Sequence, residues 1–266
     1  MIIVAHRGAS GAHPEQTRHA FHAALAAGAD AVECDVRLTR DGTLVCLHDP
    51  IIDRVSDGHG RVSQFTYPEL CRYNFGTEDD PQLPMRFDDL LVLLAEYPEA
   101  HLFVETKHPT RYGRMLEEQV VLRLRYHGLD ESPRVHVISF SPQAMLRFRQ
   151  LAPALDRIHL RDPRWGVLGD RADNIGQPSG VGFSLDEARS HPKSVARARR
   201  PIYLWTANTP EEIRAARDLG ATYLATDHPS LAARVLAEPP AAEPGDLRDR
   251  LAHRRVPHPQ PGLRPL

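Results

Sequence analysis

The sequence has little of several features that mark particular classes of protein. Its three cysteines, Cys34, Cys46 and Cys71, are an odd set without the CxxC spacing of zinc or redox sites. We therefore expect reduced thiols, no disulfide framework and a cytoplasmic location. The chain does not open on a basic segment followed by a long apolar run, and none of its apolar runs approaches the length of a membrane span. Neither a signal peptide nor stable membrane association is expected.

Charge of one sign is also scarce. Lys and Arg together number 33 and Asp and Glu number 35, which gives a formal net charge of −2. This balance provides no extended basic surface for nucleic acid or for an anionic membrane. An anionic ligand must therefore be bound locally, by a few side chains. With 266 residues and 41% hydrophobic residues, the chain is long enough for one large α/β domain or two small ones.

Short apolar runs alternate with helical segments along most of the chain. Helical periodicity is clear in six segments, at 17–27, 86–96, 112–126, 142–151, 210–219 and 229–237. Strand candidates lie at 2–5, 30–36, 43–48, 101–106, 134–140, 157–160, 181–185, 201–205 and 222–226. The alternation predicts a mostly parallel sheet, and the length suits a closed (β/α)8 barrel of the TIM type, which takes roughly 250 residues. Because the barrel has eight strands, we assign the short, Gly-flanked segment 181–185 to a loop.

Two stretches break the alternation. Residues 50–85, after the third strand, are rich in glycine and proline and predict an insertion over one end of the barrel. From Pro239 to Leu266 the chain becomes rich in proline and arginine, so we expect a disordered or loosely packed tail. The barrel domain is therefore expected to span residues 1–238.

Charged and aromatic side chains gather at the carboxyl ends of the predicted strands, where TIM-type barrels carry their active sites. These ends read His6-Arg7, Glu33-Cys34-Asp35, His48-Asp49, Glu105-Thr106-Lys107, Ser139-Phe140, Trp205-Thr206 and Thr226-Asp227. Because alternate strand residues point to opposite faces, Glu33 and Asp35 should point into the barrel while Cys34 packs outward. Glu105 and Lys107 share a face for the same reason.

The dipeptide Asp41-Gly42 predicts a hairpin, and therefore one antiparallel pair in an otherwise parallel barrel. A two-residue turn pairs Arg40 with Thr43. That register places Asp35 directly opposite His48.

Three inward carboxylates, Glu33, Asp35 and Glu105, would repel one another unless a cation joins them. Oxygen ligands without cysteine favour one hard divalent cation, Mg²⁺ or Ca²⁺, over zinc. The alternative is a set of buried ion pairs with Arg7 and Lys107, which are costly to bury. We expect instead that these two cations hold a phosphate beside the metal, since guanidinium groups bind phosphate with two parallel hydrogen bonds.

His6 and His48 lie on different strands beside this cluster, which favours acid-base chemistry over a structural role. Phe140 and Trp205 are candidates for a substrate wall, although rim aromatics serve packing equally often. For Asp227 we favour a structural role as the N-cap of the last helix. Three further histidines lie on strands without an identified partner, His101, His136 and His159.

These residues lie in segments that resemble the glycerophosphodiester phosphodiesterase family between residue 2 and about residue 237. The matching segments include AHRGASGAHPEQT, VECDVRLTRDGTLVCLHD, VETK, VISF, LWTANTPEEI and GATYLATDHP. The resemblance implies hydrolysis of glycerophosphodiesters to sn-glycerol 3-phosphate and an alcohol. It also implies roles for the site residues: Glu33, Asp35 and Glu105 as metal ligands, His6 and His48 as the acid-base pair, Arg7 and Lys107 as phosphate contacts, and Glu15 near the metal. Within the pair we assign His6 as base and His48 as acid. One departure is Gln16, where the family has asparagine.

Two alternatives remain at this stage. A lysophospholipase D-like or sphingomyelinase D-like enzyme would use a similar barrel on lipids, but the acidic segment GTEDDPQL speaks against anionic bilayers. A non-catalytic barrel used as a binding scaffold would be expected to have lost His6, His48 or a ligand. We expect a small-molecule glycerophosphodiester as the partner and no nucleic acid, and we leave the oligomeric state open.

Overall fold

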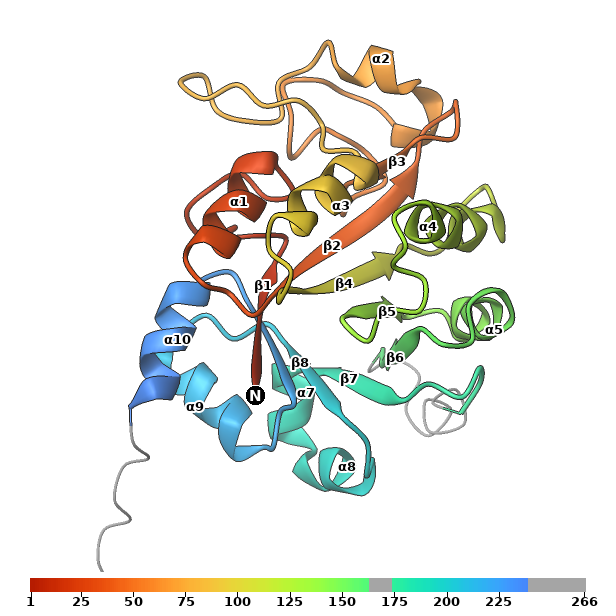
Figure 1. Cartoon of the computed structure of the whole chain (residues 1–266). Coiled ribbons are helices and arrows are strands. Elements are labelled where there is room, and N and C mark those ends of the chain that lie inside the picture. Colours follow the sequence, from red (N-terminus) through yellow and green to blue (C-terminus); the bar gives the residue numbers. More distant parts are fainter. Residues whose placement is uncertain (163–173, 239–266) are drawn as a thin grey trace, which may run out of the picture. The chain divides into compact units, whose positions relative to one another are not determined.

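Eight parallel strands form a closed barrel in the computed structural model, which describes residues 1–162 and 174–238 (Figure 1). With β3, which is antiparallel and lies outside the barrel, the described residues form nine strands: β1 (Ile2–His6), β2 (Ala31–Leu38), β3 (Leu44–Cys46), β4 (His101–Thr106), β5 (Val135–Ser139), β6 (Asp156–Leu160), β7 (Gly180–Ser184), β8 (Ile202–Trp205) and β9 (Tyr223–Thr226). Neighbouring strands follow the order β1-β9-β8-β7-β6-β5-β4-β2-β3, and β1 also pairs with β2 to close the barrel. The predicted TIM-type barrel is confirmed.

Helices separate most of the strands, and the six predicted ones are present within a few residues of their expected bounds. The helices are α1 (Arg18–Ala26), α2 (Tyr67–Leu70), α3 (Phe87–Ala95), α4 (Met115–Tyr126), α5 (Pro142–Leu151), α7 (Leu185–Ser190), α8 (Pro192–Arg197), α9 (Pro210–Asp218) and α10 (Pro229–Ala237), with a 3₁₀ turn at Val62–Gln64. Local sequence signals fix several helix starts. Thr17 caps α1 by accepting from the backbone of Ala20, and Thr209 forms a capping box with Glu212 at α9. The short helices α2, α7 and α8 were not predicted.

Strand β7 corrects the assignment of residues 181–185 to a loop. It pairs with β6 and β8 and is one of the eight barrel strands. Its glycines serve packing: a Cβ atom on Gly182 would lie 2.6 Å from Leu160 and 2.8 Å from Trp205. Glycine therefore makes room for larger neighbours here and does not end the strand. The ninth strand is β3, which pairs only with β2, in antiparallel orientation.

The β2–β3 hairpin is present, but its predicted register is wrong by one residue. Val36 pairs with Cys46, so that Asp35 lies opposite Leu47, whose backbone N–H donates to the Asp35 carbonyl at 2.9 Å. The turn has three residues, 40–42, and the Thr39 N–H donates to the Thr43 carbonyl across it. Of the turn residues only Gly42, with φ of +80°, is in the left-handed region, whereas a two-residue turn of type I′ needs two such residues.

The predicted insertion follows β3 and contains α2. Figure 1 shows this segment beyond the carboxyl end of β2. It has a small apolar cluster of its own with the hairpin, made by Val45, Leu47, Ile52, Val62, Leu70 and Phe75. The insertion therefore packs over the end of the barrel that carries the predicted site.

The core has two kinds of layer, which separate according to strand parity. Val4, Phe103 and Tyr203 are among the residues that fill the barrel interior. Cys34 lies in a different cluster, between the strands and the surrounding helices, together with residues such as Phe21. The side chains on either side of Cys34, those of Glu33 and Asp35, therefore point into the barrel, as strand parity predicted.

The predicted tail, residues 239–266, lies outside the described residues, so the domain boundary stays a prediction. Among the residues that the structure describes, no helix is both long enough and apolar enough to cross a membrane.

Candidate active site

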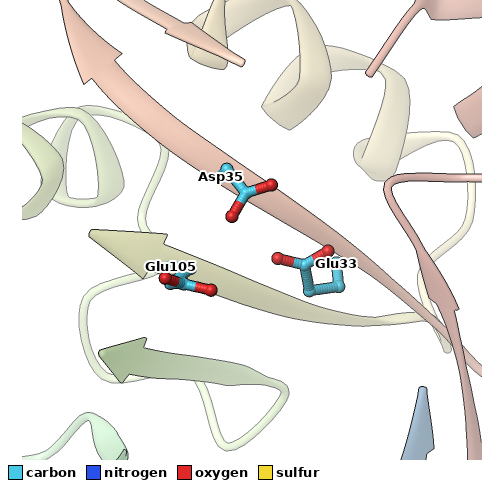
Figure 2. A group of neighbouring side chains, drawn as sticks. All are labelled: Glu33, Asp35 and Glu105. Atoms are coloured by element: carbon cyan, nitrogen blue, oxygen red, sulfur yellow. The ribbon is translucent and has the colours of Figure 1, made fainter. Parts of the chain in front are cut away.

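Three carboxyl groups meet inside the barrel near its carboxyl end (Figure 2). Glu33 and Asp35 extend from β2 and Glu105 from the neighbouring strand β4, where Asp35 and Glu105 are register partners. All three are buried, with exposed fractions of 1%, 1% and 7%, and one oxygen from each lies within 4.8 Å of the others. The predicted inward cluster is therefore present.

Two cations contact this cluster. Nζ of Lys107 lies 2.8 Å from Oδ1 of Asp35 and 2.7 Å from Oε1 of Glu105. Nε of Arg7 lies 3.2 Å from Oδ2 of Asp35 but lacks hydrogen-bond geometry and is buried without another partner among the described residues. The backbone N–H of Arg7 donates to Oε2 of Glu33. The residues predicted to bind phosphate thus lie against the carboxylates, with donor capacity left on Arg7.

The electrostatics show that these cations do not fully balance the cluster. Burial and the neighbouring carboxylates raise the pKa of Glu33 well above its usual value. Burial also raises the pKa of Glu105 to about 7, although Lys107 opposes the shift. Burial acts on Asp35 in the same direction, but Lys107 and Arg7 overcome it and hold its pKa well below the usual range. Two of the three carboxyl groups therefore retain protons more strongly than a solvated glutamate does.

Gln16 completes one side of the cluster. It has a φ of +61° and is buried, and its Nε2 donates to Oδ2 of Asp35 at 2.6 Å. Its Oε1 is buried and accepts no hydrogen bond from the described residues. Three buried carboxylates and an orphaned amide oxygen are the hard donor set that Mg²⁺ or Ca²⁺ prefers. Glu33, Asp35 and Glu105 could therefore hold such an ion.

His6, the last residue of β1, is held by Asp227, which follows β9. Nδ1 of His6 lies 2.8 Å from Oδ1 of Asp227, which also accepts from Ser10 Oγ, while Oδ2 accepts from Asn208 Nδ2. Although burial opposes it, these donors lower the pKa of Asp227 to about 2. The carboxylate is therefore charged and keeps the proton of His6 on Nδ1, which leaves Nε2 for proton transfer.

The N-cap role that we favoured for Asp227 is wrong. Both carboxylate oxygens accept from side chains of the β1 loop and the β8–α9 loop, and α10 begins only at Pro229. The contact between Asp227 and His6 arises because barrel closure sets the ends of β1 and β9 side by side, and the sequence spacing does not reveal it.

His48 is also held by a carboxylate, as His6 is. The residues that hold it, Asp49 and Arg54, had no role in the sequence analysis. Nδ1 of His48 lies 2.7 Å from Oδ1 of Asp49, whose other oxygen accepts from Nε of Arg54. Arg54 also donates to both oxygens of Glu15, at 2.7 and 2.8 Å, and Arg7 donates to Glu15 at 3.1 Å. Burial lowers the pKa of His48, although the nearby charge of Asp35 opposes the shift. Asp49 was adjacent to His48 in the sequence, whereas nothing in the sequence pointed to Arg54, which belongs to the insertion.

Phe140 and Trp205 also meet at this end of the barrel. Phe140 directly follows β5 and Trp205 ends β8, and their rings stand 5.5 Å apart in an edge-to-face contact. Both retain exposed surface. Their role as a substrate wall stays a prediction.

The other strand histidines lie apart from this site. His101 begins β4, and its Nδ1 lies 2.9 Å from Nε2 of His136, whose Nδ1 contacts Asp156 at 2.5 Å. His159 is buried on β6. The contact between His136 and Asp156 was not predictable from spacing, because the two residues become neighbours only through strand pairing.

The barrel and the charged groups at its carboxyl end place this protein in the class of TIM-barrel enzymes. Residues 6–231 match the model of the glycerophosphoryl diester phosphodiesterase family, and the chain belongs to that family. It is 38% identical over 247 residues to the probable glycerophosphodiester phosphodiesterase 1 of Mycobacterium tuberculosis, covering 86% of this chain and 89% of the relative. A glycerophosphodiester phosphodiesterase of Bacillus subtilis is 27% identical over 253 residues, covering 88% and 86%.

Solved structures are similar over most of their length. A putative glycerophosphoryl diester phosphodiesterase from Silicibacter pomeroyi matches with a TM-score of 0.79 and 25% identity, over 89% of this chain and 93% of that one. An Oleispira antarctica phosphodiesterase, solved in complex with the product sn-glycerol-3-phosphate, matches with a TM-score of 0.80 and 21% identity, over 90% and 97%. The fold and the enzyme class predicted from the sequence are confirmed.

Proposed function

We propose that this enzyme hydrolyses glycerophosphodiesters to sn-glycerol 3-phosphate and an alcohol, with His6 and His48 as the proton-transfer groups. The observation that carries the proposal is the matched arrangement of the two rings. Each has Nδ1 on a carboxylate and so keeps Nε2 for chemistry, and both belong to the end of the barrel that holds the carboxylate cluster. The names of the relatives and the product bound by the Oleispira enzyme support the choice of substrate.

Glu33, Asp35 and Glu105 would hold one divalent cation, Mg²⁺ or Ca²⁺. When bound, such an ion supplies positive charge that stabilises the negative charge developing on phosphate oxygens. Arg7 and Lys107 lie beside the same carboxylates and contribute N–H donors for the phosphate. Glu15 orients Arg7 through its hydrogen bond.

The chain's own residues account for the proton movements. His6 Nε2 removes the proton of the attacking hydroxyl, from water or from a neighbouring glycerol hydroxyl. In the second case a cyclic phosphate forms as the alcohol leaves, and water then opens the ring to give sn-glycerol 3-phosphate. The charge of Asp227 stabilises the imidazolium that forms. His48 Nε2 protonates the leaving alkoxide, and its lowered pKa makes it a stronger acid than an ordinary imidazolium. Phe140 and Trp205 border the site and exclude water from one side of the substrate.

We also infer a cytoplasmic location and a small-molecule substrate. The three cysteines are free thiols, which supports a reducing compartment. Binding to a lipid surface is the alternative, and activity on lysolipid micelles would reveal it.

The test measures release of sn-glycerol 3-phosphate from soluble diesters, with excess EDTA or with added Mg²⁺ or Ca²⁺. We expect product only with a divalent ion and in wild type, and little from His6→Ala or His48→Ala. His59→Ala is the matched control, because this histidine lies in the insertion with 83% of its side chain exposed. Full turnover in EDTA, with no metal found by elemental analysis, would contradict the metal site. Absence of product from every diester would contradict the proposed function.

A further inference from the structure

A second feature of the carboxyl end of the barrel is a cavity of about 110 Å³ beside the carboxylate cluster. It lies between the end of β2, the insertion and the loop that follows β4. Every charged side chain that lines it is basic: Arg37, Arg61, Lys107 and Arg111. None of the described Asp or Glu residues lines it. The cavity is therefore positive on several sides.

The cavity adjoins the site through two of these residues. Lys107 contacts Asp35 and Glu105 through its Nζ. Arg37 follows Asp35 by two positions on β2 and so shares its face. Its Nε and Nη2 donate to the backbone carbonyl of His48, at 2.9 and 2.6 Å. The cavity therefore lies on the side of the site that carries His48.

Three arginines of this region contact a carboxylate. Arg40 pairs with Glu69, Arg54 with Glu15 and Asp49, and Arg86 with Asp89. These three arginines therefore have a carboxylate partner within the protein.

The arginines that line the cavity lack such a partner in the part of the chain that the structure describes. Among the described residues, Arg37, Arg61 and Arg111 have no ion pair with a carboxylate, and Arg111 instead lies over the ring of Tyr112. Arg37 is half-buried. Burying a guanidinium that is not paired with a carboxylate is unfavourable, and a bound anion offsets that cost. Among the described residues, Arg37 donates to the His48 carbonyl and none of the three cavity arginines pairs with a carboxylate, so the charge pattern matches an anionic ligand group.

We propose that this cavity is a subsite for an anionic group, a carboxylate or a phosphate, on the alcohol portion of the diester. The inference rests on the proposed function, in which His48 protonates the leaving alcohol. The alcohol then departs on the side where Arg37 holds the His48 carbonyl. Guanidinium groups bind carboxylate and phosphate with paired hydrogen bonds. The cavity volume of about 110 Å³ is several times the share of one water molecule, about 30 Å³, and suits a single anionic group.

Matched substrates test the proposal. sn-Glycero-3-phosphoserine and sn-glycero-3-phosphoethanolamine differ by one carboxylate. Bis(glycerophospho)glycerol and glycerophosphoglycerol differ by a second phosphate group with its glycerol. Loss of a hydrogen bond to a charged group costs enough to lower affinity about ten- to a hundredfold. We expect wild type to prefer the more anionic member of at least one pair by such a factor in kcat/KM, and the preferred pair distinguishes carboxylate from phosphate.

The variants separate binding in the cavity from catalysis. Arg61→Met combined with Arg111→Met should bring the ratio of kcat/KM within the preferred pair close to one. Both side chains are exposed, so this variant should fold. Arg37→Met should act in the same direction but also disturb His48. Arg72→Met is the matched control, because this exposed arginine of the insertion does not line the cavity, and it should keep the wild-type ratio.

Binding measurements keep the inference independent of turnover. Calorimetry in excess EDTA gives the Kd for each member of a pair without metal-dependent cleavage. If no diester yields product, the proposed function fails, while the ratio of Kd values within each pair still decides the subsite. Ratios near one for both pairs in wild type, or a preference unchanged in the double variant, would overturn the inference.

Discussion

At the scale of single residues, the two catalytic candidates differ in how their carboxylate partners are held. Asp227 accepts from His6, Ser10 and Asn208 and is placed by the barrel strands. Asp49 is held instead by Arg54, from the insertion. The orientation of His6 therefore depends on the barrel, and that of His48 depends on a segment added to it.

The first prediction concerns Asp227→Asn. An asparagine amide can donate to Nδ1 of His6 and so favours the tautomer whose Nε2 carries the proton. We expect kcat to fall by about 10²- to 10⁴-fold, the range for a positioned acid-base group. Ser10→Ala removes only one of the donors to Asp227 and should cost far less. Wild-type kcat in Asp227→Asn would show that His6 is not the base.

The second prediction is a pH dependence of metal binding. A protonated carboxyl group is a poor ligand, so protons and the ion compete for the cluster. Glu105 has a pKa of about 7, and the pKa of Glu33 is also raised. The Kd for Mg²⁺ or Ca²⁺ should therefore decrease as the pH rises from 6 to 8, with release of protons. Calorimetry in buffers of different ionisation enthalpy counts those protons, and a pH-independent Kd without proton release would refute the prediction.

The third prediction separates the roles of the histidines. An alkoxide is a poor leaving group unless it is protonated, whereas p-nitrophenolate leaves without an acid. His48→Ala should lose about 10²- to 10⁴-fold on a natural alcohol ester but much less on a p-nitrophenyl ester. His6→Ala should be poor on both. Equal losses for His48→Ala on the two esters would exclude its role as acid, and the reverse pattern would exchange the two roles.

At the scale of elements, the insertion reaches the site through Arg54, which joins Asp49 to Glu15. The fourth prediction is that Arg54→Ala lowers kcat while the melting temperature changes little, since half-exposed ion pairs contribute little stability. Arg54→Lys should restore part of the activity. Arg40→Ala, which removes the ion pair with Glu69, is the control and should leave kcat unchanged. A parallel loss of kcat and melting temperature in Arg54→Ala would indicate a structural role only.

Patterns with a short period were predictable, and pairings across the barrel were not. Apolar periodicity located the six helices and most strands, and strand parity placed Glu33 and Asp35 on the inner face. The hairpin register was wrong because the number of turn residues depends on backbone angles at Gly42. The segment 181–185 was misassigned to a loop because Gly182 is needed for the close approach of Leu160 and Trp205, which are distant in the sequence.

The partners within the site have a related explanation. His6 and Asp227 are 221 positions apart and meet only when the barrel closes. Arg54 reaches Glu15 from an insertion whose path the sequence does not specify. Contacts of this kind follow from the topology of the whole chain, so motif spacing alone does not reveal them.

At the scale of the whole molecule, closure joins the first and last strands, and α10 follows directly on β9. Ala232 and Val235 of α10 are buried against the β7–β9 side of the barrel core. The core of the barrel that carries the site is therefore complete only when the chain extends through α10.

The fifth prediction concerns truncation after Glu238. The segment 239–266 is rich in proline and arginine and lies outside the predicted barrel. Its removal should leave kcat/KM close to wild type and shift the melting temperature by only a few degrees at most, an effect of about 1 kcal/mol or less. Truncation after His228 is the matched comparison. It also removes α10, exposes the core beneath Ala232 and should destabilise the protein strongly. If the shorter deletion alone abolished folding or activity, the segment would belong to the barrel domain and the boundary at residue 238 would be wrong.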